Sequence, residues 1–244
     1  MISIQKISLF LEGKPILNDV SIELFDGHVY ALMGPNGSGK SSLVQLLAGN
    51  PEYKSSSGAF MVAGENFLNL TPDERARRGL FVVFQQSPAI PGLSVFNFLK
   101  EAAYIRYKAH QDVIPFEQQV IEYMDFLGLS RSFLYRSLHD GFSGGEKKRF
   151  ELLQMLVLQP RWIVLDEIDS GLDVDALKLV AQTIDKLKEK NPALIVLCIT
   201  HYQRMASYLQ PSQVYVLVKG SIVAKGDFGL IDRIEADGYQ PYDY

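Results

Sequence analysis

The stretch "HVYALMGPNGSGKSSLVQLLAG", residues 28–49, decides the fold because it joins three kinds of sequence in a fixed order. An apolar run of strand length comes first, a glycine-rich loop follows, and a helical pattern of apolar residues closes the stretch. The segment from Gly34 to Ser41 fits the pattern G-x-x-x-x-G-K-[ST], and it stands in the required context, after a strand and at the start of a helix. The stretch therefore predicts a strand–loop–helix unit that binds phosphate.

The glycines of this loop let successive backbone amides point inward at phosphate oxygens, and the start of the helix adds a partial positive charge. Lys40 is placed to hold β- and γ-phosphates, and Ser41 to ligate Mg²⁺. The alternative is a plain glycine turn between strand and helix, which the context disfavours. The residues predicted to contact the nucleotide are Gly34, Pro35, Asn36, Gly37, Ser38, Gly39, Lys40, Ser41 and Ser42.

Apolar runs of strand length alternate with helical patterns along the rest of the chain, which is typical of an α/β domain with a largely parallel sheet. A capping box with proline at the first helical position, "TPDE" at 71–74, predicts a short helix before the next strand. Further strands are expected at 2–11, 80–84, 162–166, 193–200 and in a final pair around Gly220.

Residues from about 92 to 159 are almost wholly helical in pattern, and we expect no strand there. We predict one domain over residues 1–244, with a sheet-containing core at about 1–91 and 160–244 and a helical subdomain at about 92–159. The tail "YQPYDY" at 239–244 is polar and aromatic, and we expect it to be loosely ordered.

The composition is that of an ordinary globular protein, with 47% hydrophobic and 21% charged residues over 244 positions and a net charge of −4. This charge gives no general field for nucleic acid, and the basic cluster at 147–149 is read as a solvated helix face. No apolar run approaches the ~18 residues that cross a bilayer, and the N-terminus carries no signal segment, so we expect no direct membrane insertion and a cytoplasmic location. The single cysteine, Cys198, is expected to be a buried hydrophobe.

Two carboxylates end the buried strand "WIVLDE", where an unpaired charge has no structural use. At the carboxyl end of a parallel strand they would face the ligand crevice. Asp166 fits the role of holding magnesium, and Glu167 that of a general base that polarises an attacking water. The alternative, an exposed acidic turn, is disfavoured beside a phosphate loop.

Two polar residues follow other strands in the same way. His201 comes after "ALIVLCIT", and Gln85 after "LFVVF", so both are expected at the same edge of the sheet as the acidic pair. Gln85 could contact Mg²⁺ or the attacking water. Position alone leaves open whether His201 is catalytic or structural.

The segment "GFSGGEKKRFELLQM", residues 141–155, begins as a capped helix, because Ser143 and Glu146 form a capping box. Yet Gly144 and Gly145 fill its first turn, and glycine inside a helix costs about 1 kcal/mol relative to alanine. Something other than helix stability must favour these glycines.

The order of several short motifs resembles the nucleotide-binding domain of ATP-binding cassette (ABC) ATPases over nearly the whole chain. The motifs are the phosphate loop, a glutamine after a strand, "FSGGE", "LDE", "SGLD" and Thr-His. The resemblance implies an ABC-type P-loop nucleotide-binding domain, and an ATP hydrolase that uses ATP and Mg²⁺. It implies catalytic roles for Glu167, Gln85 and His201, with His201 sensing the γ-phosphate, and a metal site of Ser41, Gln85 and Asp166.

In that family the Ser-Gly-Gly turn is the signature motif, which contacts ATP held by a second copy of the chain. The resemblance thus implies a transient, ATP-dependent homodimer and assigns Asp173, in "SGLD", to the contact between copies. Gly144 and Gly145 would keep the helix start bare so that amides reach a phosphate from outside, with Ser143 as an added donor. The signature residues are Ser143, Gly144, Gly145 and Glu146.

One position departs from the family pattern. Leu11, with Phe10 beside it, stands where an aromatic residue usually stacks on adenine. This predicts weak adenine stacking and a modest nucleotide affinity.

Within the family the chain looks most like the SufC-type branch, which serves iron-sulfur cluster assembly. The similar segments are "GFSGGEKKR", "LDEIDSGLDVDALKLVA", "THYQRM", "KGDFGLIDRIEADGY" and "QQSPAIPG". The last of these resembles a partner-docking loop, and the implied partners are SufB/SufD-like scaffold proteins. Because clusters are held by several cysteine thiolates, Cys198 alone cannot carry one, and the cluster must be built on a partner.

Two other functions use overlapping residues. The ATPase subunit of a membrane transporter would share the catalytic set and differ only in its partner surface. A non-hydrolysing ATP switch is disfavoured by Glu167 and His201. A DNA-organising ABC protein is excluded because the chain has neither a heptad arm nor a basic surface.

Overall fold

The computed structural model describes residues 1–84, 89–107, 112–169, 171–200 and 203–242. Its centre is a six-stranded sheet in the order β12-β11-β3-β10-β9-β6, in which only the edge strand β12 runs antiparallel to its neighbour. The strands are β3 (Val29–Met33), β6 (Leu80–Val83), β9 (Trp162–Asp166), β10 (Ile195–Ile199), β11 (Gln213–Val218) and β12 (Ser221–Gly226). The predicted α/β fold with a largely parallel sheet is confirmed.

The central sheet is buried on both faces, which explains why its strands read as continuous apolar runs. Along β9, Ile163 and Leu165 enter one hydrophobic cluster, while Trp162 and Val164 enter another. Successive side chains of a strand point to opposite faces, so each cluster covers one face of the sheet.

A second, antiparallel sheet packs with the first through the helix that follows the glycine loop. Its order is β2-β1-β4-β5, formed by β1 (Ile2–Leu11), β2 (Lys14–Leu24), β4 (Ser55–Val62) and β5 (Glu65–Asn66). Buried residues of β1 and β2, of helix α1 (Lys40–Ala48) and of the parallel sheet form a single hydrophobic cluster. The helix that starts at Lys40 is therefore fixed by apolar contacts to both sheets.

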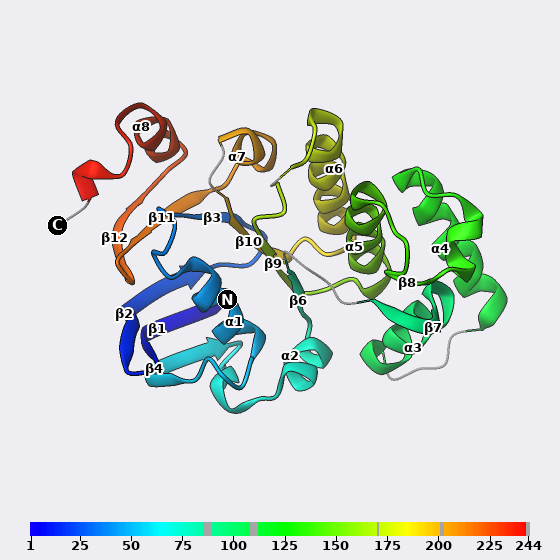
Figure 1. Cartoon of the computed structure of the whole chain (residues 1–244), viewed down its shortest axis with the longest axis horizontal. Coiled ribbons are helices and arrows are strands. Elements are labelled where there is room, and N and C mark those ends of the chain that lie inside the picture. The colour runs from blue at the N-terminus through cyan, green and yellow to red at the C-terminus, as the bar shows by residue number, and fades with distance from the viewer. Residues whose placement is uncertain (85–88, 108–111, 170, 201–202, 243–244) are drawn as a thin grey trace.

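The remaining helices cover the other face and the ends of the parallel sheet. Figure 1 shows α3, α4 and α5 gathered at one end of the molecule, away from β1, β2 and β4. The helices are α2 (Pro72–Arg78), α3 (Val95–Tyr107), α4 (Val113–Leu127), α5 (Gly144–Leu158), α6 (Val174–Lys190), α7 (Gln203–Leu209) and α8 (Gly229–Asp237). Three short 3-10 helices accompany them: η1 (Phe67–Asn69), η2 (Arg131–Tyr135) and η3 (Gln240–Tyr242). The subdomain limits near residues 91 and 160 stay a prediction.

Helix α2 holds the end of α1 through a buried arginine. Arg75, only 3% exposed, donates hydrogen bonds to the carbonyls of Leu46 and Leu47 at 2.6 and 2.8 Å. It also donates to the carbonyls of Leu68 and Leu70 at 3.1 and 3.0 Å. Burial lowers the pKa of Arg75 to about 10, so the side chain stays protonated at neutral pH. These bonds satisfy carbonyls that the end of a helix otherwise leaves without partners.

The expectation that residues 92–159 contain no strand is wrong. Strands β7 (Ile90–Ser94) and β8 (Ser137–Leu138) pair antiparallel in a small sheet of their own. Both are short and lie next to helical segments, so their period of two is hidden by the helical pattern around them.

The expectation of a loosely ordered tail is wrong for the part of it that the structure describes. The segment after α8 forms η3, and Tyr239 and Tyr242 pack against a hydrophobic cluster of α7, α8 and β11. Within the described ranges, no helix combines the length and the apolar character that crossing a membrane requires.

Candidate active site

The glycine-rich loop joins the end of β3 to the start of α1, as predicted. Gly34 is closed in so tightly that a Cβ atom there would lie 2.1 Å from the carbonyl oxygen of Leu217. Gly39, the residue before α1, has a φ of 107°, which favours glycine. The loop therefore keeps its shape only with glycine at these two positions.

The ammonium group of Lys40 lies against the backbone of its own loop. Its Nζ atom donates to the carbonyl oxygens of Gly34 and Pro35 at 2.8 and 2.9 Å. Burial lowers the pKa of Lys40, while the nearby carboxylates of Glu167 and Asp166 act to raise it. A buried cation thus stands at the loop with two carboxylates near it.

Two hydroxyl groups of the loop region suit an anionic ligand. Ser38 is 3% exposed, and its Oγ atom has no hydrogen-bond partner in the structure as described. A buried hydroxyl of this kind is usually satisfied by a ligand or a water molecule. Ser41, in the first turn of α1, is exposed and accessible to a metal ion. The loop, Lys40 and these hydroxyls form a cradle that fits a phosphate chain.

Two distant segments hold the loop in place. The amide of Gly220, in the turn between β11 and β12, donates to the carbonyl of Ser38 at 2.9 Å. The hydroxyl of Tyr239, in the C-terminal segment, accepts a hydrogen bond from the amide of Gly34 at 3.1 Å. A cavity of about 370 Å³ lies beside the loop. It is lined by Pro35, Asn36, Gly37, Ser38, Val218, Lys219, Tyr239 and Gln240.

No motif in the sequence points to Tyr239. Its hydrogen bond with the Gly34 amide predicts a measurable effect on nucleotide binding. Tyr239→Phe keeps the ring but leaves the Gly34 amide without its acceptor, at a cost of about 0.5–1.5 kcal/mol. We expect nucleotide affinity to fall by up to about tenfold in a fluorescence titration. Tyr30→Phe is the matched control, because its hydroxyl accepts from the Phe25 amide away from the loop. Equal affinities in the two variants would show that Tyr239 does not support the loop.

The acidic pair lies at the edge of the sheet that carries the loop, as predicted. Asp166, the buried last residue of β9, is in register with Ile199 of β10, which is in turn in register with Leu32 of β3. Glu167 follows with a φ of 49°, and its amide donates to the Ile199 carbonyl at 3.0 Å. Such a left-handed backbone is strained for glutamate by roughly 1–3 kcal/mol, and strain of this kind clusters at functional sites.

A buried hydrogen bond links the loop after Glu167 to the end of β10. The hydroxyl of Thr200 donates to the carboxylate of Asp169, and both residues are buried. His201 and Gln85 lie outside the described residues, so their catalytic and metal-binding roles stay predictions. The strand before Gln85 ends at the expected edge, because Val83 is in register with Leu165 of β9.

The signature turn has the predicted capping box. The Ser143 hydroxyl accepts from the Glu146 amide at 3.2 Å, and the Glu146 carboxylate accepts from the Ser143 amide at 2.8 Å. Gly144 and Gly145 are exposed, and a Cβ atom added at either would meet nothing within 4 Å. Their backbone is also outside the left-handed region. Nothing in the described structure of the chain itself requires these glycines.

The signature turn and the phosphate loop are not brought together within the chain. No hydrogen bond or ion pair joins residues 143–146 to residues 34–42, all of which the structure describes. Asp173 caps α6 by accepting from the Ala176 amide at 2.8 Å, and its role in a dimer stays a prediction. At the position expected for adenine stacking, Leu11 packs on the core, while Phe10 is 52% exposed.

Comparisons with known proteins agree with this arrangement. The model of a family described as "ABC transporter" matches residues 17–170. A "Probable ABC transporter ATP-binding protein" of Streptococcus pyogenes is 43% identical over 98% of the chain and 93% of its own length. The "Probable ATP-dependent transporter SufC" of Escherichia coli is 42% identical over 98% of the chain and 97% of its own length.

Solved structures show the same fold. The ATP-binding cassette MJ0796, solved as a dimer in a post-hydrolysis state bound to ADP and Pi, has a TM-score of 0.80 and is 21% identical. The match covers 93% of this chain and 99% of that one. The phosphate loop, the acidic pair at the shared sheet edge and these similarities lead to one assignment: the chain belongs to the ABC family and is a SufC-like ABC ATPase, an enzyme that hydrolyses ATP.

Proposed function

We propose that the chain couples ATP binding, dimerisation and hydrolysis to conformational change in SufB/SufD-like scaffold proteins during iron-sulfur cluster assembly. The observation that carries this proposal is the similarity to E. coli SufC, which spans 98% of this chain and 97% of the relative. It therefore extends well past residues 17–170, the part that matches the general family model. The buried state of Cys198 supports a cluster assembled elsewhere, on a partner.

In the proposed reaction each described residue has a defined task. Lys40 exchanges its two carbonyl partners for phosphate oxygens and balances their charge. Glu167 accepts a proton from the attacking water as general base. Ser41 and Asp166 would hold Mg²⁺, which neutralises charge that develops on the phosphates. Gln85 and His201 would complete the site around the water and the γ-phosphate.

The second half of each site is proposed to come from another copy of the chain. Gly144 and Gly145 have open space around them and an ordinary helical backbone, so their lack of side chains serves a contact outside the chain. The capping box occupies the amides of Ser143 and Glu146, whereas the amides of Gly144 and Gly145 carry no side-chain cover and suit a phosphate held by the partner copy. The site is therefore incomplete in a single copy.

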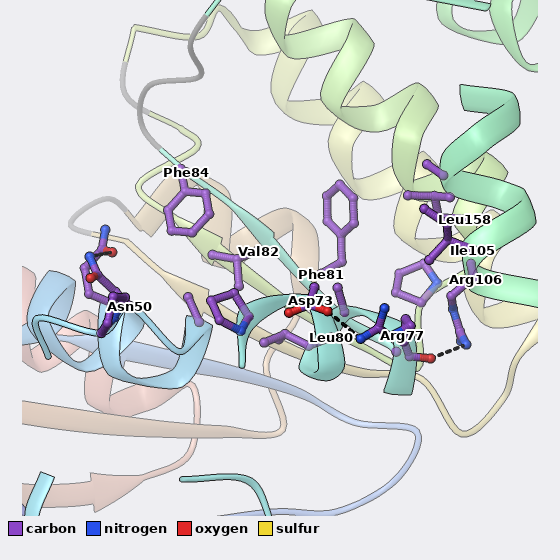
Figure 2. A pocket seen from close by; sticks show the side chains of 18 residues that line it. Asn50, Asp73, Arg77, Leu80, Phe81, Val82, Phe84, Ile105, Arg106 and Leu158 are labelled. Carbon is purple, nitrogen blue, oxygen red and sulfur yellow. Dashed lines mark hydrogen bonds and ion pairs between the residues drawn. The ribbon is translucent and has the colours of Figure 1, made fainter. Parts of the chain in front are cut away.

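The partner surface is proposed to be an apolar groove between the core and the helical end of the molecule. This cavity of about 620 Å³ is lined by residues of α1, α2, β6 and α3 and by the end of α5. Figure 2 shows Leu80, Val82 and Phe84 lining it on one side and Ile105 and Leu158 on another. Phe84 directly precedes Gln85 in the sequence, so a protein seated in the groove would touch the segment that leads to the γ-phosphate.

The segment after Gln85 contributes less to this surface than its sequence suggests. Phe96 and Phe98 pack inward, with ring contacts to Phe116 and Phe150 at 6.0 Å in each pair. Ile90 is 43% exposed and remains available to a partner. Both phenylalanines are partly buried against the hydrophobic cluster of the helical end, which favours their structural interpretation.

A negative charge introduced at Ile105 should test whether partner proteins bind in the groove. Ile105 is 50% exposed and lines the groove, so Ile105→Glu is expected to abolish capture of scaffold proteins while ATP affinity is unchanged. Ile114→Glu is the matched control, because Ile114 is 70% exposed on α4 and does not line the groove. Tagged chain is recovered from native cells, both with and without detergent, and its partners are identified by mass spectrometry.

The second candidate function, an ATPase subunit of a membrane transporter, is favoured by the S. pyogenes relative, a probable ABC transporter ATP-binding protein. Recovery of SufB/SufD-like proteins that depends on Ile105 would support the cluster-assembly function. Recovery of an integral membrane protein with the same dependence would replace it with the transporter function.

A further inference from the structure

An arginine that the motifs do not include holds the signature turn from both sides. Arg136 follows η2 and precedes β8. Its Nη1 atom pairs with Oε1 of Glu146 at 2.6 Å, and its Nη2 atom donates to the Gly141 carbonyl at 2.7 Å. Its guanidinium carbon also lies 4.8 Å from the ring centre of Phe142. One side chain thus contacts residues before and after Ser143.

Glu146 links Arg136 to the signature turn, because its carboxylate binds both of them. While Oε1 binds Arg136, Oε2 accepts the hydrogen bond from the Ser143 amide at 2.8 Å. The Ser143 amide is the main cause of a lowered pKa at Glu146, which burial opposes and Arg136 reinforces. The carboxylate therefore stays ionised and bridges the arginine to the helix N-cap.

The ring beneath the arginine is itself fixed. Phe142 is buried, and its ring centre lies 4.5 Å from that of Phe133 and 6.0 Å from that of Phe150. Arg136 also lies over Phe133, at 5.4 Å. A planar guanidinium can stack on rings and bind a carboxylate and a carbonyl at once, which a lysine cannot do. An isolated surface ion pair would lack these contacts.

The capping box and the first helical hydrogen bonds support the turn, but its two glycines add no side-chain contacts of their own. Gly144 and Gly145 have no neighbouring atoms within 4 Å of a would-be Cβ, and glycine leaves the backbone unusually free. The direction of their amides is then set by the residues on either side. Those residues, Phe142 and Glu146, are the ones that Arg136 contacts.

We propose that Arg136 is a positioning residue that fixes the signature turn for the phosphate of a nucleotide bound by a second copy of the chain. This inference rests on the proposed composite site. It predicts that Arg136 matters for hydrolysis and dimer closure, and that it has no part in the binding of ATP to the chain's own phosphate loop.

The first experiment compares full-length variants in steady-state ATP hydrolysis and in nucleotide titration. Arg136→Gln is expected to lower kcat about tenfold with unchanged nucleotide affinity of the monomer. Arg136→Lys, which keeps the charge without the planar fork, should recover only part of the rate, and Glu146→Gln should lose activity similarly. Arg149→Gln is the matched control, because Arg149 donates to the Gly128 carbonyl at 3.0 Å in the same helical block. Equal activity of Arg136→Gln and Arg149→Gln would overturn the proposal.

The second experiment mixes chains, which separates a positioning role from a folding defect. In a mixed dimer of Lys40→Ala and Arg136→Gln chains, one composite site carries both lesions and the other is intact, so activity should partly return. Lys40→Ala mixed with Ser143→Ala tests the composite site itself. If ATPase activity returns when Lys40→Ala is mixed with Ser143→Ala but not when it is mixed with Arg136→Gln, the positioning role of Arg136 alone would be overturned. No recovery in either mixture, with dimers confirmed by sizing, would overturn the composite site and with it the inference.

Discussion

Lys40→Ala is expected to abolish productive binding of ATP. The Lys40 ammonium is the cation that contacts the carbonyls of the phosphate loop, and the carboxylates of Asp166 and Glu167 lie close enough to influence its pKa. Without it, those carboxylates would repel the β- and γ-phosphates with no compensating charge. In the bound state Lys40 would form a buried charge pair with these phosphates. Loss of one partner of such a pair costs about 3–5 kcal/mol, which lowers the affinity for ATP at least roughly a hundredfold.

The measurement is a titration with a fluorescent ATP analogue, joined to a steady-state hydrolysis assay. Lys225→Ala serves as the control, because the Lys225 ammonium lies 5.5 Å from the Tyr215 ring centre and outside the phosphate loop. A thermal unfolding curve for each variant shows whether the fold is kept. Unchanged hydrolysis by a folded Lys40→Ala chain would refute the assignment of the loop as the nucleotide site.

Glu167→Gln is expected to bind ATP with normal affinity but to hydrolyse it at least about a hundredfold more slowly, which corresponds to ~2.7 kcal/mol of barrier. The amide keeps the shape of the carboxylate and its place after β9, but it cannot accept the proton of the attacking water. The ATP-bound state should therefore persist and hold two copies together.

Initial rates and size-exclusion chromatography with ATP test both parts of this expectation. Glu189→Gln, an exposed glutamate of α6, is the control for the loss of one negative charge. A slow variant that stays monomeric with saturating ATP would contradict the sandwiched dimer. A variant with full activity would instead remove Glu167 from the role of general base.

The parts of the fold that the sequence predicts correctly are those set by local patterns. The β3–loop–α1 unit follows from a buried run, a glycine spacing and a helical period, all within residues 28–49. The capping boxes at Thr71 and Ser143 need only three residues of context, and both are present. The loop and the acidic pair follow β3 and β9, which run parallel on either side of β10, so their carboxyl ends lie at the same edge of the sheet.

The parts that were missed depend on contacts between distant residues. Tyr239 binds the Gly34 amide although the two residues are 205 positions apart in the sequence, and no pattern within the tail predicts this hydrogen bond. Arg136 lies in a short irregular segment between η2 and β8. Its contacts with Gly141 and Glu146 can be recognised only from the folded structure. Strand β7 pairs with β8 only because the chain returns to it after α3, α4 and η2. Motifs alone contain none of this information.

Arg75 connects the wall of the proposed docking groove to the helix that follows the phosphate loop. Its helix, α2, supplies Ala76 and Arg77 to the groove wall, while Arg75 itself grips the last carbonyls of α1. Because Arg75 ties α2 to the C-terminal end of α1, and the phosphate loop leads into the other end of this nine-residue helix, a displacement of α2 by a bound partner would act on α1 as a whole. A docked scaffold protein would therefore have a physical connection to the nucleotide site through α2, Arg75 and α1, in addition to the segment that leads to Gln85.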